Sequence, residues 1–453
     1  MREQITHQTP TPDLDDMESI VSTIYKKAEE IAARVVLNPR TPGTGLTQRL
    51  DDIFTSRLWG IPIMLTLLAI VFWITIKGAN YPSEVLTHLF HLLEQWLTTT
   101  LAWFKAPDWV HGAFVLGMYR GLAWVVAVML PPMAIFFPLF TLLEDFGYLP
   151  RVAFNLDRLF QRAGTHGKQA LTMSMGFGCN AAGVIACRII DSPRERLVAV
   201  LTNNFVPCNG RFPILIVMGT TVAALTLGTE TSGFLPTSVV LLGIVVAVIA
   251  TFLVSSALTS TVLRGEPSFF LLELPPYRRP LIGQVLSRSF FDRTLFVLAR
   301  AVVVAAPAGL LTWILANVSW RDLTLITHLT AWLEPLGKIL GLDGVILLAF
   351  ILGLPANEIV IPIMLMIYLQ AGTMLSLDGL ESFATILAQN GWNWVTAINF
   401  TIFTIFHWPC ATTLLTIKKE TGSWGWVVLS AVIPTLLGVM ISFVVAKVTG
   451  FFI

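Results

Sequence analysis

Two Pro-Cys sequences constrain the fold of this chain more than any other feature. FVPCNGRFP around Cys208 and HWPCATT around Cys410 each interrupt a run that is otherwise apolar enough to cross a bilayer. Because proline has no backbone N–H, Pro207 and Pro409 each leave a carbonyl one turn earlier without its helical donor, that of Ile405 in the second case. Such breaks persist in a membrane only inside protein or beside a water-filled cavity. Paired broken helices in the two halves of a membrane chain predict a transport site, here one whose permeant meets sulfur.

The composition places the chain among membrane proteins. Hydrophobic residues make up 55% of the 453, charged residues 13%, and the mean hydropathy is +0.73, whereas a soluble domain carries about 25% charged residues. A net charge of +1 gives no reason to expect a nucleic-acid partner. The apolar stretches are too long for buried strands and too many for one signal peptide. We therefore predict an all-α polytopic membrane helix bundle with about eight spans, and half-helices at the breaks.

Apolar and basic stretches divide the chain into four parts. These are a cytoplasmic N-terminal segment over 1–58 with an amphipathic helix at 16–35, a first membrane half over 59–262, a cytoplasmic loop over 263–293, and a second membrane half over 294–453. The cytoplasmic side is assigned from the Lys and Arg residues near the ends of the apolar stretches. Residues 83–105 carry His88, His91 and Glu94, so we expect them to form an interfacial helix rather than a span.

The two halves share a short internal repeat. GFGCNAAG (176–183) followed by FVPCNGR (205–211) parallels GLPANE (353–358) followed by HWPCATT (407–413). Each half thus has a break of small residues that contains an Asn, and then a Pro-Cys break. Because transporters are commonly built from such repeats, we expect the four breaks to meet at the interface of the halves.

Glu358 is the strongest electrostatic signal in the sequence. It lies midway along the apolar stretch DGVILLAFILGLPANEIVIPIMLMIYLQ, where an ionisable group costs roughly 2.5–3.5 kcal/mol on insertion scales. Pro362 also frees the carbonyl of Glu358, and Asn357 is adjacent, so three oxygen donors fall within one turn. The alternative interpretation is a structural carboxyl that is protonated or paired with an arginine.

These donor groups favour a metal cargo. Thiolate, carboxylate and amide oxygen together suit a borderline transition metal better than Mg²⁺ or Ca²⁺. The cysteines lack the C-x₂-C spacing of structural zinc sites, so they fit a transient path better than a tight site. The predicted metal ligands are Cys179, Cys208 and Cys410 through sulfur, and Glu358, Asn180, Asn209 and Asn357 through oxygen. Weaker candidates are His407, Thr412, Glu144 and Asp145.

Several long motifs carry a family resemblance. The sequences LLEDFGYLPRVAFNLDRLFQRAGTHGK, GFGCN, CRIIDSPRERL, NNFVPCNGRFP, GEPSFFLLELPPYRRP, GLPANEIV and PCATTLLTIKKETGSWGW occur in that order over roughly residues 46–447. They resemble the membrane domain of the FeoB ferrous-iron transporters. The resemblance implies a multi-pass protein of a bacterial or archaeal plasma membrane that imports Fe²⁺ through two Gate regions, at about 113–230 and 343–416. It also matches the three cysteines and Glu358 to the family's Gate residues.

The sequence departs from the family pattern at two Gate positions. A Pro commonly follows GCN in the family, where this chain has Ala181, and a Lys commonly precedes the acidic residue, where it has Asn357. These departures leave open another divalent metal or a small solute such as a nucleoside as cargo. A further alternative, from another class, is a membrane scaffold or sensor for a cytosolic G protein.

The GTPase module with which family members usually begin has no counterpart in this sequence. Nothing matches G-x-x-x-x-G-K-[ST], and TPGTGLTQR lacks the Lys and the Ser/Thr that would contact phosphates and Mg²⁺. We therefore expect no GTP site and no enzymatic activity here, and a split system in which a separate cytosolic GTPase docks on the helix at 16–35. Small accessory iron-transport proteins and a homo-oligomer are further expected assemblies.

Overall fold

The structure is a computed structural model that describes residues 14–35, 46–56, 58–165, 167–227, 234–265, 277–278, 280–374 and 380–452. The chain divides into two compact units, Met1–Ile53 and Phe54–Ile453. The first contains α1 (Leu14–Val35) and all but the last residue of α2 (Leu46–Phe54). α1 confirms the helix predicted at 16–35, and the side chains of Ile20, Ile24 and Ile31 on it are exposed.

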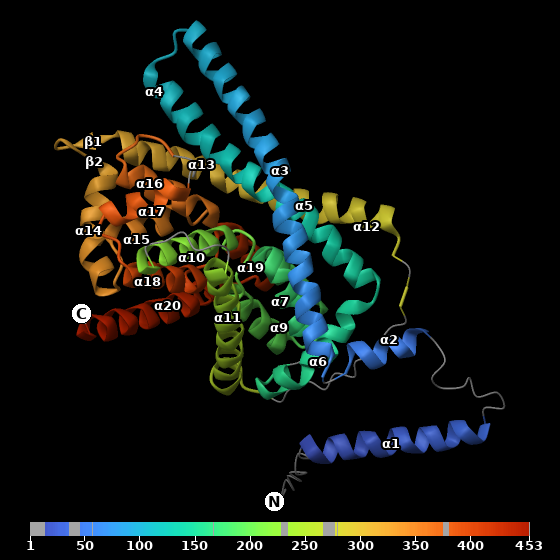
Figure 1. Cartoon of the computed structure of the whole chain (residues 1–453). Coiled ribbons are helices and arrows are strands. Elements are labelled where there is room, and N and C mark those ends of the chain that lie inside the picture. The colour runs from blue at the N-terminus through green and yellow to red at the C-terminus, as the bar shows by residue number, and fades with distance from the viewer. Residues whose placement is uncertain are drawn as a thin grey trace, which may run out of the picture. The chain divides into compact units, whose positions relative to one another are not determined.

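In the first half of the second unit, the elements are helical segments. They are α3 (Gly60–Trp103), α4 (Asp108–His111), η1 (Gly112–Tyr119), α5 (Arg120–Asp145), α6 (Tyr148–Arg162), α7 (Lys168–Gly178), α8 (Asn180–Ala186), η2 (Cys187–Ile189), α9 (Pro193–Thr202), η3 (Asn203–Phe205), α10 (Phe212–Leu227) and α11 (Phe234–Ser260). The segments α4, η1 and α5 run on without interruption as one helix from Asp108 to Asp145. Figure 1 shows α3 lying beside α5, with α4 at one end of the pair.

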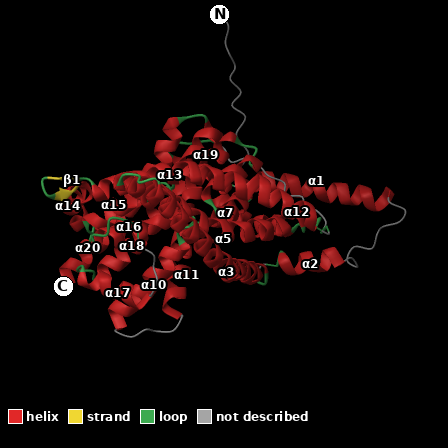
Figure 2. Ribbon diagram, turned by 90° about the horizontal axis from the view of Figure 1, so that it is seen from above, coloured by secondary structure: helices red, strands yellow, loops and turns green. Residues whose placement is uncertain are grey.

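The second half contains the only strands found among the described residues. Its elements are α12 (Ile282–Arg288), η4 (Ser289–Leu295), α13 (Phe296–Asn317), β1 (Ser319–Trp320), β2 (Leu323–Thr324), α14 (Leu325–Ile339), α15 (Gly344–Leu352), η5 (Asn357–Ile359), α16 (Val360–Tyr368), α17 (Leu380–Gln389), α18 (Trp394–Phe406), α19 (Ala411–Thr421) and α20 (Trp424–Phe452). β1 and β2 form an antiparallel hairpin in which Trp320 pairs with Leu323. Its two turn residues, Arg321 and Asp322, both have positive φ, at 52° and 65°, as a two-residue type I′ turn requires. Helices dominate the view in Figure 2.

The prediction of a separate interfacial helix at 83–105 is wrong. α3 is one helix of 44 residues that continues through Pro82, so it is about 66 Å long at 1.5 Å per residue. That is about twice the thickness of a hydrocarbon core. Its distal part is tied to the next helices by an ion pair between Glu94 and Arg120 and by a hydrogen bond of 2.9 Å from the Tyr119 hydroxyl to the Phe90 carbonyl.

The last part of the loop predicted at 263–293 is helical in the structure. Residues 282–293 belong to α12 and η4, which continue into α13 as one helical run to Asn317. Residues 266–276 and 279 of the predicted loop lie outside the described residues. A π-helical segment such as η4 accommodates an extra residue per turn and so keeps the run continuous.

Six helices among the described residues are long and apolar enough to cross a membrane, and a seventh span results if the bent pair α14–α15 is counted as one. The predicted count was about eight. The difference arises at the breaks, where the apolar helices Asn180–Ile189, Phe212–Ala224 and Asn357–Tyr368 are each too short to span alone. The structure therefore confirms the helix bundle with half-helices.

Side-chain caps fix where three helices near the breaks begin. The Ser192 hydroxyl accepts from the backbone N–H of Glu195 at the start of α9, with Pro193 as the first helical residue. Asp343 caps α15 at 2.6 Å from the Ile346 nitrogen, and Asn393 caps α18. Each cap supplies an acceptor to an N–H that has no partner within the helix.

Candidate functional site

Four helix breaks, two from each half, face one another inside the second unit. In the first half they lie between α7 and α8 at Cys179, and between η3 and α10 at residues 206–211. In the second half they lie between α15 and η5 at residues 353–356, and between α18 and α19 at residues 407–410. These are the four positions of the predicted repeat.

The backbone repeats as well as the sequence. Cys179 precedes α8 with φ −157° and ψ 126°, and Ala356 precedes η5 with φ −153° and ψ 125°. Both are extended residues between two helical segments, and each is followed by an Asn, Asn180 or Asn357. Ala356 is therefore the second-half counterpart of Cys179.

Within each half, one backbone hydrogen bond joins the two breaks. The nitrogen of Asn209, after Cys208, donates to the carbonyl of Gly178 at 3.4 Å. In the second half the nitrogen of Ala411, after Cys410, donates to the carbonyl of Leu354 at 2.7 Å. These bonds use backbone groups that have lost their helical partners, and they hold each Pro-Cys segment against the small-residue break of its own half.

The glycines of GFGCNAAG make room for a buried asparagine. A Cβ at Gly176 or Gly183 would lie 2.7 or 2.5 Å from the side-chain oxygen of Asn203. The Asn203 amide donates to the carbonyl of Asn180 at 3.0 Å. The Asn180 side chain, with its amide oriented to match its acceptors, donates to the carbonyls of Gly176 and Val206 at 3.1 Å each. Asn180 thus satisfies carbonyls from both first-half breaks.

Arg211 joins the first Pro-Cys break to the second. Its side chain is fully buried, and Nη1 donates to the carbonyls of Asn204 and Ile405 at 3.0 Å each. Nη2 donates to the carbonyl of His407 at 3.0 Å. The Ile405 carbonyl is the one that Pro409 leaves without a helical donor, so an arginine from one half satisfies the break of the other.

A polar chain connects Cys208 to His407 through Asn357. The Asn357 side chain lies 4.0 Å from the Cys208 sulfur and 3.2 Å from Nε2 of His407. The other ring nitrogen of His407, Nδ1, lies 2.8 Å from the carbonyl oxygen of Thr404. His407 is buried, at 1% exposure. It contacts Asn357, which lines the cavity, but does not line the cavity itself.

A cavity of about 30 Å³ lies where the breaks meet. It is lined by all seven of the predicted ligands, Cys179, Asn180, Cys208, Asn209, Asn357, Glu358 and Cys410, and by the weaker candidate Thr412. A cavity of this volume has room for only a few water molecules. Residues far apart in the sequence, as predicted, therefore share one small polar space.

Glu358 faces this cavity beside Gly210. A Cβ added at Gly210 would overlap the carboxylate of Glu358, so the two halves approach here as closely as glycine allows. Among the described residues, no Lys or Arg forms an ion pair with Glu358. Within the described residues, the alternative in which an arginine pairs with Glu358 is therefore wrong. Arg211 instead donates to backbone carbonyls.

Three weaker candidates lie away from the cavity. His407 does not line it, and Glu144 and Asp145 are exposed at the end of α5. Glu144 instead lines a separate, larger pocket. Within the residues that the structure describes, no three His, Cys, Asp or Glu side chains lie close enough together to hold an ion.

Sequence reasoning missed several residues that build the cavity. Met129 and Met133 of α5 line it, although neither was among the predicted ligands. Their spacing of four residues around Pro131 was the available signal, because it places both on one face of a helix. Cys187, the cysteine that was not among the predicted ligands, donates to the carbonyl of Gly183 at 3.3 Å and does not line the cavity.

Two family models match the chain. One, described as Gate, nucleoside recognition, matches residues 126–223 and 298–424. The other, described as the C terminus of ferrous iron transport protein B, matches residues 237–292. The Gate match includes all four breaks.

The chain is also similar to proteins named Fe(2+) transporter FeoB. It is 27% identical over 440 residues to that of Staphylococcus aureus, which covers 94% of this chain and 62% of the relative. With the Methanocaldococcus jannaschii protein it shares 27% over 446 residues, 95% of this chain and 62% of the relative. A Porphyromonas gingivalis relative, 24% identical over 89% of this chain and 51% of its own length, is named a fusion of Fe(2+) transport protein A and FeoB. The chain thus spans less than two thirds of these relatives, and no solved structure matches it.

Proposed function

The chain belongs to the FeoB family, whose membrane domain it represents, and we propose that it forms the membrane pathway through which Fe²⁺ enters the cell. One observation carries the proposal. Three cysteines and a glutamate, which lie at or directly after four different helix breaks, line one cavity in the interior of a multi-pass membrane protein. Intramembrane ionisable groups that face a cavity mark ion pathways.

The donor set of the cavity suits Fe²⁺. Cys179, Cys208 and Cys410 offer sulfur, Glu358 offers a carboxylate, and Asn180 offers amide oxygen. Sulfur with oxygen favours borderline divalent metals, whereas Mg²⁺ and Ca²⁺ prefer oxygen alone. We propose that these side chains replace part of the hydration shell of the passing ion.

The arrangement supports transit rather than storage. The three cysteines and Glu358 line the cavity from four different segments, and no three of the His, Cys, Asp and Glu side chains described in the structure are clustered tightly enough to hold an ion. Conduction requires a site that binds well enough to admit the ion and loosely enough to release it. Small movements of the half-helices would bring two or three donors together and then separate them.

Flux measurements test this proposal. The purified protein in proteoliposomes, supplied with a candidate GTPase partner and Fe²⁺, should transport the ion. Cys208→Ser and Glu358→Gln should each lower the initial rate of transport at least about tenfold. A tenfold change corresponds to about 1.4 kcal/mol. Cys187→Ser is the matched control, because this thiol is buried in the same half but does not line the cavity. Equal flux in wild type and Cys208→Ser would rule out the proposed pathway.

The alternative cargoes differ in size or in ligand preference. A nucleoside would need a pocket of about 300 Å³ or more, whereas the cavity measures about 30 Å³. Its volume thus favours an ion in this conformation. Competition of Fe²⁺ flux by Mn²⁺, Zn²⁺ or uridine would identify another divalent metal or a nucleoside as the better cargo.

A separate cytosolic GTPase is the partner that we propose for this chain. The 453 residues contain no P-loop sequence, so GTP binding must come from residues outside them. α1 offers a docking surface, because Ile20, Ile24 and Ile31 are exposed along it. Binding of the GTPase to the full chain and to a chain without residues 1–40 tests this, and equal binding would exclude docking on α1.

A scaffold or sensor for that GTPase is the competing function. If the chain is a scaffold, Cys208→Ser and Glu358→Gln should still bind the GTPase, and neither wild type nor any variant should show Fe²⁺ flux. One experiment therefore separates the two functions.

Bacterial and archaeal relatives suggest the plasma membrane as the location. A small accessory protein is a further partner to test, since one relative is named as a fusion with transport protein A.

A further inference from the structure

A second pocket, of about 700 Å³, is built from both halves and is distinct from the cavity between the breaks. Of its 17 lining residues, six are charged and the other eleven are apolar. The charged ones are Lys168, Arg188, Arg300, Lys419, Glu144 and Glu420. The four cationic and two anionic side chains give the pocket a net charge of +2, which disfavours a cation as its occupant.

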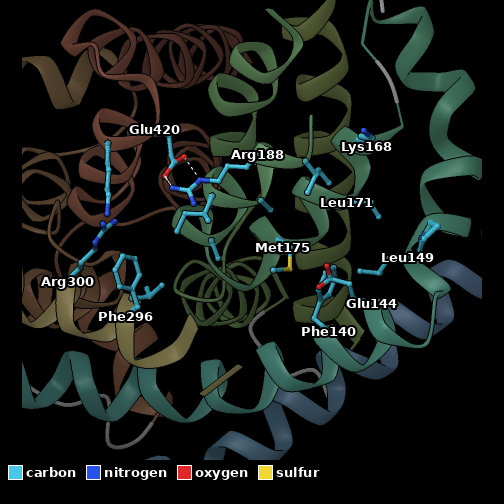
Figure 3. A pocket seen from close by; sticks show the side chains of 17 residues that line it. Phe140, Glu144, Leu149, Lys168, Leu171, Met175, Arg188, Phe296, Arg300 and Glu420 are labelled. Carbon is cyan, nitrogen blue, oxygen red and sulfur yellow. Dashed lines mark hydrogen bonds and ion pairs between the residues drawn. The ribbon is translucent and has the colours of Figure 1, made fainter. Parts of the chain in front are cut away.

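Two of the pocket's cations form no ion pair with a carboxylate among the described residues. Glu420 accepts two hydrogen bonds of 2.7 Å from Arg188, and Lys168 pairs with Asp191 at 2.6 Å. Among the ion pairs of the described residues none includes Arg300 or Lys419. Figure 3 shows Arg188 and Glu420 facing each other.

Arg300 and Lys419 converge on one aromatic ring. The Arg300 guanidinium lies 4.3 Å from the ring centre of Phe296, and the Lys419 ammonium lies 5.7 Å from it. Arg300 also donates to the Thr416 hydroxyl at 2.7 Å, which fixes the guanidinium at the pocket wall. Phe296 is itself 39% exposed, and Figure 3 shows it beside Arg300. Two positive groups held near an exposed apolar surface are suited to an amphiphilic anion.

We propose that this pocket binds an anionic phospholipid, with its phosphate between Arg300 and Lys419 and the start of its acyl chains against the apolar wall. Free phosphate would satisfy the cations but would leave most of a 700 Å³, largely apolar pocket in contact with water. Basic pockets between membrane helices on the cytoplasmic side bind anionic headgroups. Two of these cations, Lys168 and Lys419, lie near the ends of apolar stretches, where the positive-inside rule places cytoplasmic basic residues.

A lipid in this pocket would contact the helices that carry part of the cavity. Met175 of α7 and Ala182 of α8 line the pocket, while Gly178 and Cys179, between them in sequence, line the cavity. Arg300 and Lys419 come from the second half. An occupant would therefore connect the first-half break to the second half, whichever ion the cavity conducts.

Lipid binding to the purified full chain tests the inference without transport. Native mass spectrometry and thermal stability in detergent would compare added phosphatidylglycerol, phosphatidylcholine and inorganic phosphate. We expect phosphatidylglycerol alone to bind and stabilise, and Arg300→Gln and Lys419→Gln each to weaken its binding about fivefold, equivalent to about 1 kcal/mol per basic residue. Arg300→Lys, which keeps the charge, should stay within about twofold of wild type, since the headgroup attraction is mainly electrostatic.

Lys447→Gln is the matched control. Lys447 also lies over a phenylalanine, with its ammonium 5.8 Å from the Phe443 ring centre, but it does not line the pocket. Its removal should leave phosphatidylglycerol binding unchanged. The inference is overturned if phosphatidylcholine binds equally well, if inorganic phosphate alone gives the full stabilisation, or if the double variant Arg300→Gln/Lys419→Gln binds phosphatidylglycerol as wild type does.

Discussion

Nη1 of Arg211 lies 3.0 Å from the carbonyl oxygen of Ile405, 194 residues later in the chain. The same guanidinium bonds the carbonyls of Asn204 and His407. Since a guanidinium has five N–H donors in a fixed plane, one side chain can satisfy carbonyls from both Pro-Cys breaks. The two halves of the repeat are thus joined by a residue that lies beside the cavity but does not line it.

Replacing Arg211 should separate the breaks. In Arg211→Gln several buried carbonyls lose their donor, each at a cost of about 1–3 kcal/mol. We expect a lower thermal midpoint in detergent and loss of Fe²⁺ flux. Arg211→Lys should recover little, because an ammonium cannot reproduce the planar set of donors.

Arg321→Lys serves as the control for this experiment. Arg321 lies in the exposed turn between β1 and β2, so its replacement should leave both the midpoint and the flux unchanged. A wild-type midpoint and flux in Arg211→Gln would show that the carbonyls find other partners.

Gly210→Ala should displace the Glu358 carboxylate. The added Cβ would occupy the position of the carboxylate, so we expect Fe²⁺ flux to fall to the level of Glu358→Gln. Gly283→Ala is the matched control, because a Cβ at Gly283 meets nothing within 4 Å. The double variant Gly210→Ala/Glu358→Asp, with a shorter acid, should regain flux over Gly210→Ala. A double variant no better than the single one would contradict the steric explanation.

His407 should act on the cavity through Asn357 rather than as a ligand. Nε2 of His407 contacts the Asn357 side chain, and the ring packs on Phe350 with centroids 4.8 Å apart. His407→Phe keeps that packing but releases Asn357, so we expect binding of Cd²⁺, used as a thiophilic probe, to weaken about tenfold, as for residues that orient ligands. Cys208→Ser should weaken it more. Isothermal titration of both variants checks the order, and the reverse order would make His407 a direct ligand.

The local sequence was sufficient to predict the helix breaks, but not which donors bind the carbonyls that the breaks leave free. Pro409 frees the carbonyl of Ile405 whatever the tertiary structure is, and that is visible in the sequence. That the donor is Arg211 depends on how the two halves pack, and no periodicity or spacing encodes it. For Met129 and Met133 the spacing predicts a shared helix face, but that this face lines the cavity depends on the position of α5.

One wrong prediction came from judging polarity by position along the chain. Residues 83–105 looked interfacial because of their His and Glu residues, yet they extend α3 beyond the membrane thickness. Glu144 and Asp145 are the exposed last residues of α5 and do not line the cavity, so their role stays a prediction. In contrast, the ligands predicted at the breaks were brought together, because each lies where the backbone itself requires a polar environment.

Ala356→Cys should complete the repeat with a fourth thiol. Ala356 has the backbone conformation of Cys179, lines the same cavity, and is 2% exposed, so a cysteine there would present its sulfur to the other three. Cysteine is small and readily buried, so the fold should tolerate it. Because affinity for soft metals rises with the number of thiolate ligands, we expect tighter Cd²⁺ binding and slower Fe²⁺ release, hence lower flux. Ala349→Cys, at a buried alanine of α15 away from the cavity, is the control and should change neither. Unchanged Cd²⁺ affinity in Ala356→Cys, measured by titration of folded protein, would mean that the cavity does not bring its cysteines to one ion.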